Sequence, residues 1–542
     1  MKIKAIVRNS VVLQSAALFC CFSALYILFP TSLPSQHYDS LSYAYSAEAA
    51  GSMPLLGNHP LGHVIFNLSL ALSHSIGYQS RALPVCQIAN SLISGLCVSI
   101  LFILIALNFR VKNTYALGCA ILFGLTYSYW RHAGTADIYN ISILFLSLTW
   151  FFLTKETLGN HLQSISLAGI AASLALASHQ LSAVILPAGA VFLLLKTTER
   201  AVKLKAVFVF LTVAAVGTIC WYCLLGYIAT SSFSPETLFL WAQGYMQIDN
   251  PTYGVHFSTN SIPIAWETLS NALLISMGAG RSQMVRNGLL IFLLLIVLLG
   301  IKENWSKNTT RRQVLIAFAV QCLLSWSIIL WWEPYNTKFY LLSLLPWCIT
   351  LAICCEAFDD MACRFFQTCK ADRLGRGIKY FFFTILFLIA VLNINYGKMR
   401  EYKAVAAFND AFAVWRDHSN PDDVLITAGD LVPHLLFWGN RPNTIHLYRT
   451  LQQSRNSADK FYLLRKEIRQ ALCNNKTVLL APAACMYIAD EQLSVLRLSR
   501  QELCNFFHRY EMKAVFDYQN LINDAQEKVY KLALPGTEDC NS

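Results

Sequence analysis

Long stretches without a single Asp, Glu, Lys or Arg constrain this chain more than any other feature. A helix that crosses a bilayer needs about 20 predominantly apolar residues, and stretches of this kind recur up to residue 397. Only 13% of the residues are charged and 55% are hydrophobic, whereas about 25% of the residues of a soluble domain are charged. The sequence therefore predicts an α-helical membrane protein that crosses the bilayer many times.

Eleven membrane-spanning helices are predicted, near residues 12–29, 84–108, 114–130, 137–154, 164–178, 181–196, 206–229, 286–301, 314–331, 337–356 and 378–396. The start MKIKAIVRNS and the apolar run after it resemble a signal peptide. No convincing small-residue cleavage site precedes Asp39, so we expect the first helix to remain uncleaved. The segment 60–76 is apolar but short and contains polar residues, and we predict that it lies in the membrane interface.

The distribution of Lys and Arg predicts which loops face the cytoplasm, because cytoplasmic loops carry an excess of these residues. With a cytoplasmic N-terminus, the inner loops and their flanks hold 19 Lys and Arg, and the outer segments before the tail hold five. Counting 60–76 as a full span would place the basic clusters at 197–205 and 357–377 outside. Eleven spans leave the tail outside. The net charge of +11 is thus attributed to cytoplasmic loops rather than to nucleic-acid binding.

The composition changes after residue 397, where charges become dense. The segments VLITAG (424–429) and TVLLAPAAC (477–485) are typical of strands, and 457–475 is typical of an amphipathic helix. Alternating strands and helices predict a small α/β domain. Two domains are therefore predicted: a transmembrane domain, 1–397, with outer loops 30–83 and 231–285, and an extracytoplasmic α/β domain, 398–542.

The polar residues that are unusual for a membrane protein gather in the predicted outer loops. Charged groups at membrane depth are costly and usually functional. The candidates are Asp39, Glu48, His59 and His63 in the first outer loop, Arg131 and Asp137 in the turn 130–140, His179 in the next hairpin, Arg281, and Glu333 and Lys338 in 331–340. Their shared side predicts a site at the outer surface of the membrane.

Short motifs in these loops resemble the GT-C glycosyltransferases, and in particular the bacterial relatives of protein O-mannosyltransferases. The likeness is clear over about residues 1–200, thinner over 201–396 and absent from the tail. An Asp follows the first helix, and a His-Pro-x-Gly sequence opens a juxtamembrane helix. The motifs are Asp39-Ser40, Asn58-His59-Pro60-Leu61-Gly62, Trp130-Arg131 followed by Ala136-Asp137-Ile138-Tyr139, His179-Gln180 and Glu333-Pro334.

The resemblance implies transfer of a sugar from a polyprenyl-phosphate donor to a protein, lipid or glycan acceptor at the outer face of a bacterial cytoplasmic (inner) membrane. We expect an inverting hexosyl or pentosyl transferase. Asp39 is then the general base, and Arg131, Arg281 and Lys338 are cations for the departing phosphate. The other substrate contacts are Glu48, His59, His63, Asp137, His179 and Glu333.

No cofactor or metal is expected. Metal-dependent relatives carry Asp-x-Asp in the second outer loop, whereas GTADIY holds a single acid. His59 and His63 have i,i+4 spacing, which suits a metal, but no third ligand is evident.

Structural roles compete with each of these assignments. Asp39 is predicted at the N-cap of a helix over 40–50, a position that favours Asp, and Asp137 suits the N-terminus of its span. In the structural interpretation, Glu333 and Lys338 form an ion pair with each other. The candidate arginines then only anchor their helices in the membrane interface. Glu48 lies nine residues after Asp39, which places the two side chains on opposite faces of a continuous helix.

Three other functions remain open at this point. One is an oligosaccharide ligase or polymerase that uses a diphosphate-linked donor. Another is a transporter or lipid flippase, although transporters often show internal repeats and polar groups at the bilayer midplane, which this sequence does not clearly show. The last is a binding protein that kept the fold and lost activity.

Overall fold

The computed structural model forms two compact units. The helical unit comprises Met1–Thr31, Ser46–Gln247 and Val255–Lys398, and the tail unit comprises Ser32–Tyr45, Ile248–Gly254 and Met399–Ser542. The structure describes residues 2–29, 38–48, 59–155, 161–196, 199–243, 260–274, 281–307, 309–332, 334, 336–365, 383–385, 387–389, 391–393, 414–415, 417–427, 443–447, 450–451, 459–481, 498–519 and 526–534.

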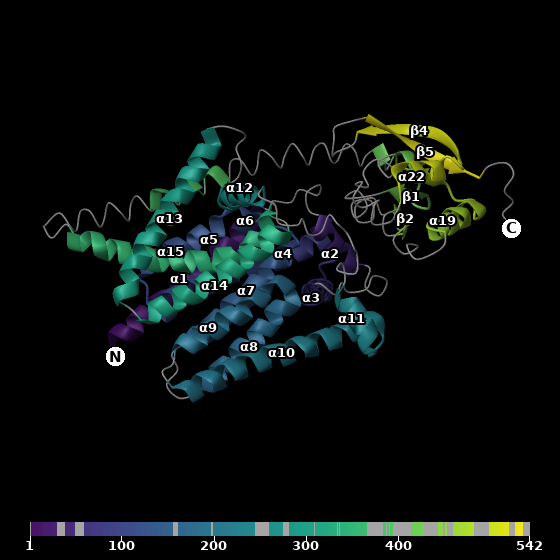
Figure 1. Ribbon diagram of the computed structural model, residues 1–542. Coiled ribbons are helices and arrows are strands. Elements are labelled where there is room, and N and C mark those ends of the chain that lie inside the picture. Colours follow the sequence, from purple (N-terminus) through teal and green to yellow (C-terminus); the bar gives the residue numbers. More distant parts are fainter. Residues whose placement is uncertain are drawn as a thin grey trace. The chain divides into compact units, whose positions relative to one another are not determined.

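Helices make up the described part of the helical unit (Figure 1). They are α1 (Lys2–Leu28), α3 (Pro60–Ser75), α4 (Ala82–Ile103), η2 (Leu104–Asn108), α5 (Asn113–Leu125), α6 (Tyr127–Ala133), α7 (Tyr139–Thr154), α8 (His161–Ser178), η3 (Gln180–Val184), α9 (Ile185–Lys196), α10 (Arg200–Thr230), α11 (Pro235–Gln243), α12 (Ser261–Leu273), α13 (Arg281–Lys307), α14 (Thr309–Trp332), η5 (Thr337–Tyr340) and α15 (Leu341–Phe365). The helix α2 (Tyr38–Glu48) is shared between the two units.

The apolar helices coincide with the eleven predicted spans, which confirms a polytopic membrane protein. Six are long and apolar enough to cross a membrane: Ser10–Leu28, Ala82–Asn108, Arg200–Thr230, Arg286–Trp305, Thr310–Trp332 and Thr337–Met361. Five apolar helices are shorter: Asn113–Leu125, Tyr139–Thr154, Leu162–Ser178, Gln180–Lys196 and Phe383–Asn393. The predicted hairpin at His179 is also confirmed, since α8 ends at the residue before it.

Two helices that were predicted from the sequence have different bounds in the structure. The predicted span 114–130 is broken at Thr126, which has an extended backbone and donates its hydroxyl to the carbonyl oxygen of Phe123 at 2.8 Å. The segment after the break becomes the separate short helix α6. Asp39 lies within the first turn of α2 rather than at its cap, because the helix begins at Tyr38.

The segment predicted to lie in the membrane interface forms the 16-residue helix α3. Leu68, Leu72 and Ile76 follow one another at a spacing of four residues and are 64%, 65% and 75% exposed. This spacing puts three apolar side chains on one face of the helical path. The opposite face is buried against the unit and includes Phe66 and Leu70, as expected for a helix that lies on a membrane surface.

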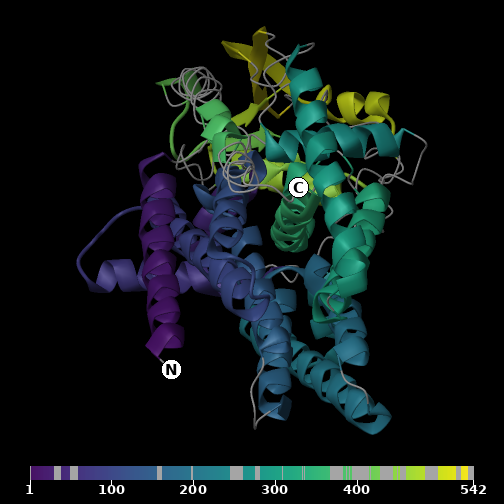
Figure 2. The ribbon, with the colours of Figure 1, turned by 90° about the vertical axis from the view of Figure 1, so that its left-hand side faces the viewer.

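Small residues let the spans approach closely. α8 and α10 run side by side (Figure 1, Figure 2), and α1 packs along α4. A Cβ atom at Gly169 of α8 would lie 2.8 Å from Val213 of α10, and one at Gly300 of α13 would overlap the backbone of Cys354 in α15. Such close backbone contacts are typical of helix pairs in membranes, where small residues line the interface.

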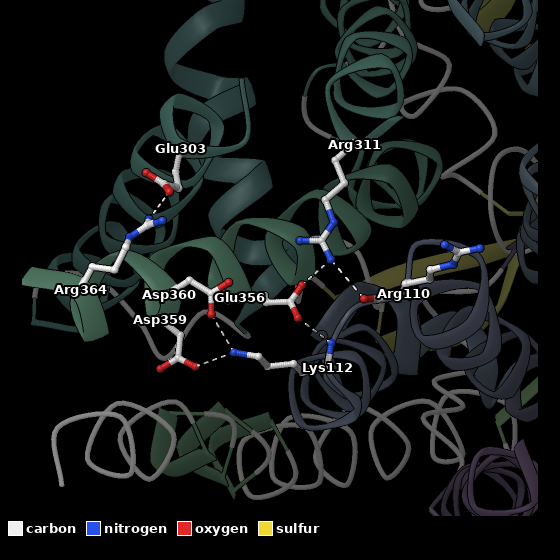
Figure 3. Close-up of polar contacts among 8 residues, drawn as sticks. All are labelled: Arg110, Lys112, Glu303, Arg311, Glu356, Asp359, Asp360 and Arg364. Carbon is white, nitrogen blue, oxygen red and sulfur yellow. Dashed lines mark hydrogen bonds and ion pairs between the residues drawn. The ribbon is translucent and has the colours of Figure 1, made fainter. Parts of the chain in front are cut away.

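Ionic contacts join the loops at one end of the helical unit (Figure 3). The guanidinium of Arg311 lies 2.5 Å from the carboxylate of Glu356 and donates to the carbonyl oxygen of Arg110 at 3.1 Å. The ammonium of Lys112 contacts Asp360 at 2.8 Å and Asp359 at 3.4 Å. We call this the ion-pair end. It brings together three of the loops that the Lys and Arg count assigned to the cytoplasm.

The tail unit contains a five-stranded sheet of order β2-β1-β3-β5-β4. The strands are β1 (Val424–Thr427), β2 (Thr444–His446), β3 (Val478–Leu480), β4 (Glu511–Gln519) and β5 (Gln526–Ala533), with helices α19 (Tyr462–Cys473) and α22 (Arg500–Phe507). β1 is parallel to β2 and β3, whereas β5 is antiparallel to β3 and β4. The predicted strands at 424–429 and 477–485 and the helix at 457–475 are confirmed; the sequence analysis did not predict β2, β4 and β5.

Both faces of this sheet are covered. Val424 and Ile426 of β1 pack into one apolar cluster with α19, and the intervening Leu425 packs into a second cluster with Trp415. Buried side chains on both faces of a strand are typical of parallel strands between covering layers.

Candidate functional site

A short loop between α6 and α7 lies at the end of the helical unit opposite the ion-pair end, and α4 holds it in place. The side-chain amide of Asn90 donates to the carbonyl oxygens of His132 and Thr135 at 2.6 and 2.7 Å. The hydroxyl of Ser91 donates to the carbonyl oxygen of Ala133 at 3.1 Å. These groups are buried, so the hydrogen bonds are shielded from water and fix the backbone of the loop.

This loop carries a buried histidine–carboxylate pair. Nδ1 of His132 lies 2.6 Å from Oδ2 of Asp137, and both side chains are buried. The other carboxylate oxygen of Asp137 accepts the backbone N–H of Tyr139 at 3.4 Å, at the start of α7. Asp137 therefore has the helix-start contact that its structural interpretation predicted, and an imidazole partner in addition.

A layer of rings lies next to this pair. The ring centroid of Tyr139 is 4.3 Å from that of His179, and His179 stacks on His59 with centroids 4.6 Å apart. The ammonium of Lys338 lies 5.5 Å from the centre of the Tyr139 ring, within the range of a cation–π contact. Four segments of the chain thus meet: the starts of α3 and α7, the 178–180 hairpin and η5.

Burial keeps two histidines of this region neutral. Burial, and then the Lys338 ammonium, lower the pKa of His179 from 6.5 to about 3, while Asp137 opposes the shift. Burial lowers the pKa of His63 from 6.5 to about 4. Nδ1 of His179 accepts the backbone N–H of Leu181 at 3.2 Å. Because a neutral imidazole has one donor and one acceptor, Nε2 of His179 carries the proton and is a hydrogen-bond donor.

The His-Pro-x-Gly sequence has a packing role at this site. Pro60 is the first residue of α3, a position where its missing N–H costs no helical hydrogen bond. A Cβ atom at Gly62 would overlap the side chain of Ile138, so only glycine lets α3 approach the start of α7. We call the region formed by His59, the turn 132–139, His179 and Lys338 the site end.

The other predicted site residues lie in different settings. Both carboxylate oxygens of Glu48 contact Arg81, at 2.8 and 3.1 Å, and one also accepts the N–H of Ala82 at 2.8 Å. This contact joins the end of α2 to the start of α4. Arg131 lies on α6 and Asp39 on α2, both half-buried. Arg281 begins α13, but its side chain and the whole of Glu333 lie outside the described residues.

The structure adds residues that the sequence analysis did not single out. His132 was visible beside Asp137 in the same turn, and Asn90 was visible as an amide inside an apolar span. Arg286, at the start of α13, is 3% exposed and contacts the side chain of Asn271 in α12. Because α12 packs against α6 and η5, Arg286 belongs to the same end of the unit.

Among the described residues, no three His, Cys, Asp or Glu side chains come together in an arrangement that could hold a metal ion.

The chain was then compared with known proteins. No family model and no curated protein matches the sequence. Among solved structures, it is similar to ArnT from Cupriavidus metallidurans bound to undecaprenyl phosphate, with a TM-score of 0.54 and 11% identity over 95% of this chain and 97% of that one.

Two further matches are weaker. The Archaeoglobus fulgidus oligosaccharyltransferase has a TM-score of 0.49 and 12% identity over 97% of this chain and 74% of that one. The S. cerevisiae protein O-mannosyltransferase complex Pmt1-Pmt2 has a TM-score of 0.33 and 15% identity over 49% of this chain and 37% of that one. The fold comparison rests on ArnT, and it confirms the resemblance found in the sequence: this chain has the fold of a GT-C glycosyltransferase.

Proposed function

We propose that this protein is a glycosyltransferase that takes a sugar from a polyprenyl-phosphate donor and passes it to a protein, lipid or glycan acceptor. The observation that carries the proposal is the group of Lys338, His179, Tyr139 and the His132–Asp137 pair at one end of the spans. The fold supports it, since the ArnT structure that it resembles is bound to undecaprenyl phosphate.

Cations at the site end suit a departing phosphate. Positive groups fixed where negative charge develops stabilise the transition state of group transfer. Lys338 is held over the ring of Tyr139, and the neutral His179 offers an N–H donor in the same layer. Arg286 is a second cation: it is buried, and its Nε has no hydrogen-bond partner among the described residues. We propose that Lys338 and Arg286 contact the donor phosphate.

Asp39 is our proposal for the general base. Its carboxylate would accept the proton of the acceptor hydroxyl or amine as the new bond to sugar C1 forms and the C1–phosphate bond breaks. Attack from the face opposite the phosphate inverts C1. Asp39 is half-buried in the first turn of α2, at the point where the chain has left the first span. Glu48 is not part of the proposed donor site because Arg81 and Ala82 engage its carboxylate.

We place the reaction at the extracytoplasmic face of a bacterial inner membrane. Loops rich in Lys and Arg gather at the ion-pair end, as expected for cytoplasmic loops. In the tail unit, Cys473 is disulfide-bonded. Disulfides persist in oxidising compartments such as the periplasm, which supports a tail on the outer side.

Sugar transfer in proteoliposomes tests the proposal. Wild type, Asp39→Asn and the control Asp360→Asn would receive radiolabelled polyprenyl-monophosphate and polyprenyl-diphosphate sugars, and sugar released to water or to added acceptors would be counted. Asp360 is an exposed acid at the ion-pair end. We expect release from a monophosphate donor by wild type and Asp360→Asn alone. Release of sugar only from diphosphate donors would favour a ligase. No release from any donor would reject the proposal that the protein is a glycosyltransferase.

A further inference from the structure

We infer that Asn90 is a positioning residue of this site. The inference rests on the proposed glycosyl transfer and concerns how the His132–Asp137 pair is held for it. Asn90 is fully buried in the first half of α4, whose other buried residues are apolar or small. It does not belong to the ring layer, and it acts through the loop that α4 supports.

Asn90 braces the loop by joining two of its carbonyl groups. The amide donates to the carbonyl oxygen of His132, in the last turn of α6, and to that of Thr135 in the loop. The same Thr135 oxygen accepts the backbone N–H of Asp137 at 2.9 Å. The Asn90 amide, Thr135 and Asp137 are thus linked in series, so the position of the carboxylate depends on a side chain from another helix.

Removing this brace would take one donor from each of two buried carbonyl groups, leaving the His132 oxygen with the Thr135 hydroxyl at 3.3 Å and the Thr135 oxygen with the N–H of Asp137. A buried acceptor that loses one of its donors favours a rearrangement that restores the lost hydrogen bond. Rotation of the 133–137 backbone is such a rearrangement, and it would move Asp137 relative to His132. Displacements of about 1 Å at a reacting centre cost about 100-fold in rate, so a small change of the loop suffices to lower activity.

The chain supplies a matched control at the other end of the same helix pair. The amide of Asn108 donates to the carbonyl oxygen of Phe151 at 2.8 Å and to the hydroxyl of Thr154 at 2.9 Å. Asn108 therefore joins the α4–η2 helix to α7 through one part-buried amide at the ion-pair end, whereas the buried amide of Asn90 joins α4 to α6 and the loop before α7. Replacing either asparagine by alanine removes an amide that joins two helices. Only the replacement of Asn90 also removes the brace on the loop.

Steady-state transfer kinetics of Asn90→Ala, Asn90→Asp, Asn108→Ala and Asp137→Asn test the inference in full-length protein. We expect kcat to fall about 30-fold or more in both Asn90 variants, since displacement of the Asp137 side chain in the proposed site lowers kcat, and to change little in Asn108→Ala. Because Asn90 acts through Asp137, Asn90→Ala should cause little further loss when added to Asp137→Asn. Equal losses in Asn90→Ala and Asn108→Ala, or fully multiplicative losses in the double variant, would overturn the inference.

Hydrogen exchange gives a readout that does not depend on activity. We expect Asn90→Ala to speed amide exchange in peptides covering 132–139 and to leave 104–112 unchanged, and Asn108→Ala to do the reverse. Unchanged exchange at 132–139 in Asn90→Ala would reject the brace even if activity fell. If wild type transfers no sugar, the proposed function fails, and the exchange experiment still decides whether Asn90 holds the loop.

Discussion

The two ends of the helical unit use polar groups in different ways. At the ion-pair end, acids and bases are paired directly, as in Arg311 with Glu356 and Lys112 with Asp360 (Figure 3). At the site end, the buried His132–Asp137 pair is set among backbone hydrogen bonds and rings that hold the polar groups, as in the turn braced by Asn90 and the lysine over Tyr139. We infer that charge at one end mainly fixes helices, and that charge at the other end is held for a substrate.

The largest expected effect is on activity at the site end. Lys338→Ala should lower kcat about 100-fold or more, because a cation that stabilises a departing phosphate acts in the transition state. Lys196→Ala is the matched control, since Lys196 also lies over a ring, 5.6 Å from the centre of Phe192, but at the opposite end. Initial rates of sugar transfer measure this effect. Similar losses of rate in both variants would show that a lysine at the site end has no special role in transfer.

The next effect is on stability at the ion-pair end. Arg311→Ala removes the guanidinium from Glu356, whose side chain is only 7% exposed. Breaking a buried pair from one side costs about 3 kcal/mol, because a buried charge is left without its partner. We expect the free energy of unfolding in mixed detergent micelles to fall by about this amount, with turnover per folded molecule preserved. A large loss of turnover with unchanged stability would place Arg311 in the reaction instead.

Acid should destabilise the site end through His63. The folded chain keeps this imidazole neutral because burial lowers its pKa to about 4, whereas the unfolded chain binds a proton below about pH 6.5. The contribution of His63 to stability is therefore complete above pH 6.5 and declines as the pH falls from 6.5 toward 4. Thermal unfolding at pH 7.5 and pH 5 should show a smaller drop in His63→Gln than in wild type. Equal drops in the two proteins would show that other groups control the acid response.

The smallest effect is expected at the exposed rim of the ion-pair end. The side chains of Lys112 and Asp360 are 48% and 53% exposed, and solvent screens such pairs to about 0.5 kcal/mol. Asp360→Ala should therefore change the free energy of unfolding far less than Arg311→Ala, because Lys112 keeps its contact with Asp359, whose side chain is 4% exposed. Equal losses of unfolding free energy in the two variants would mean that burial does not determine how strongly each contact stabilises the fold.

The spans and their grouping into two ends were predictable because both depend on local signals. An apolar run fixes a span, and the count of Lys and Arg assigns each loop to a side. The strands β4 and β5 escaped prediction although EMKAVFDYQ and QEKVYKLA partly alternate apolar and polar residues. Their pairing with each other and with β3 depends on contacts that a single segment does not reveal.

The pairing of site residues was not predictable for the same reason. Glu48 contacts Arg81, 33 residues away, and Asn90 reaches His132, 42 residues away. Separations this long along the chain follow no helical or strand periodicity, so the sequence alone does not pair these residues. Each contact depends on how two helices pack. The convergence of His59, His179 and Lys338 was foreseen only as a shared side of the membrane. The stacking of His59 on His179, and the contacts of His179 and Lys338 with the Tyr139 ring, required the structure.

The order of the strands in the tail unit has a consequence for synthesis. β5, the last strand, lies between β3 and β4 and forms hydrogen bonds with both. The sheet is therefore incomplete until nearly the whole chain has been made, and pairings between distant segments form slowly. A chain that ends before residue 526 lacks β5 and leaves β3 with an open edge, and an open edge invites association with other chains. A truncation before β5 therefore leaves the spans intact and removes the strand that completes the tail sheet.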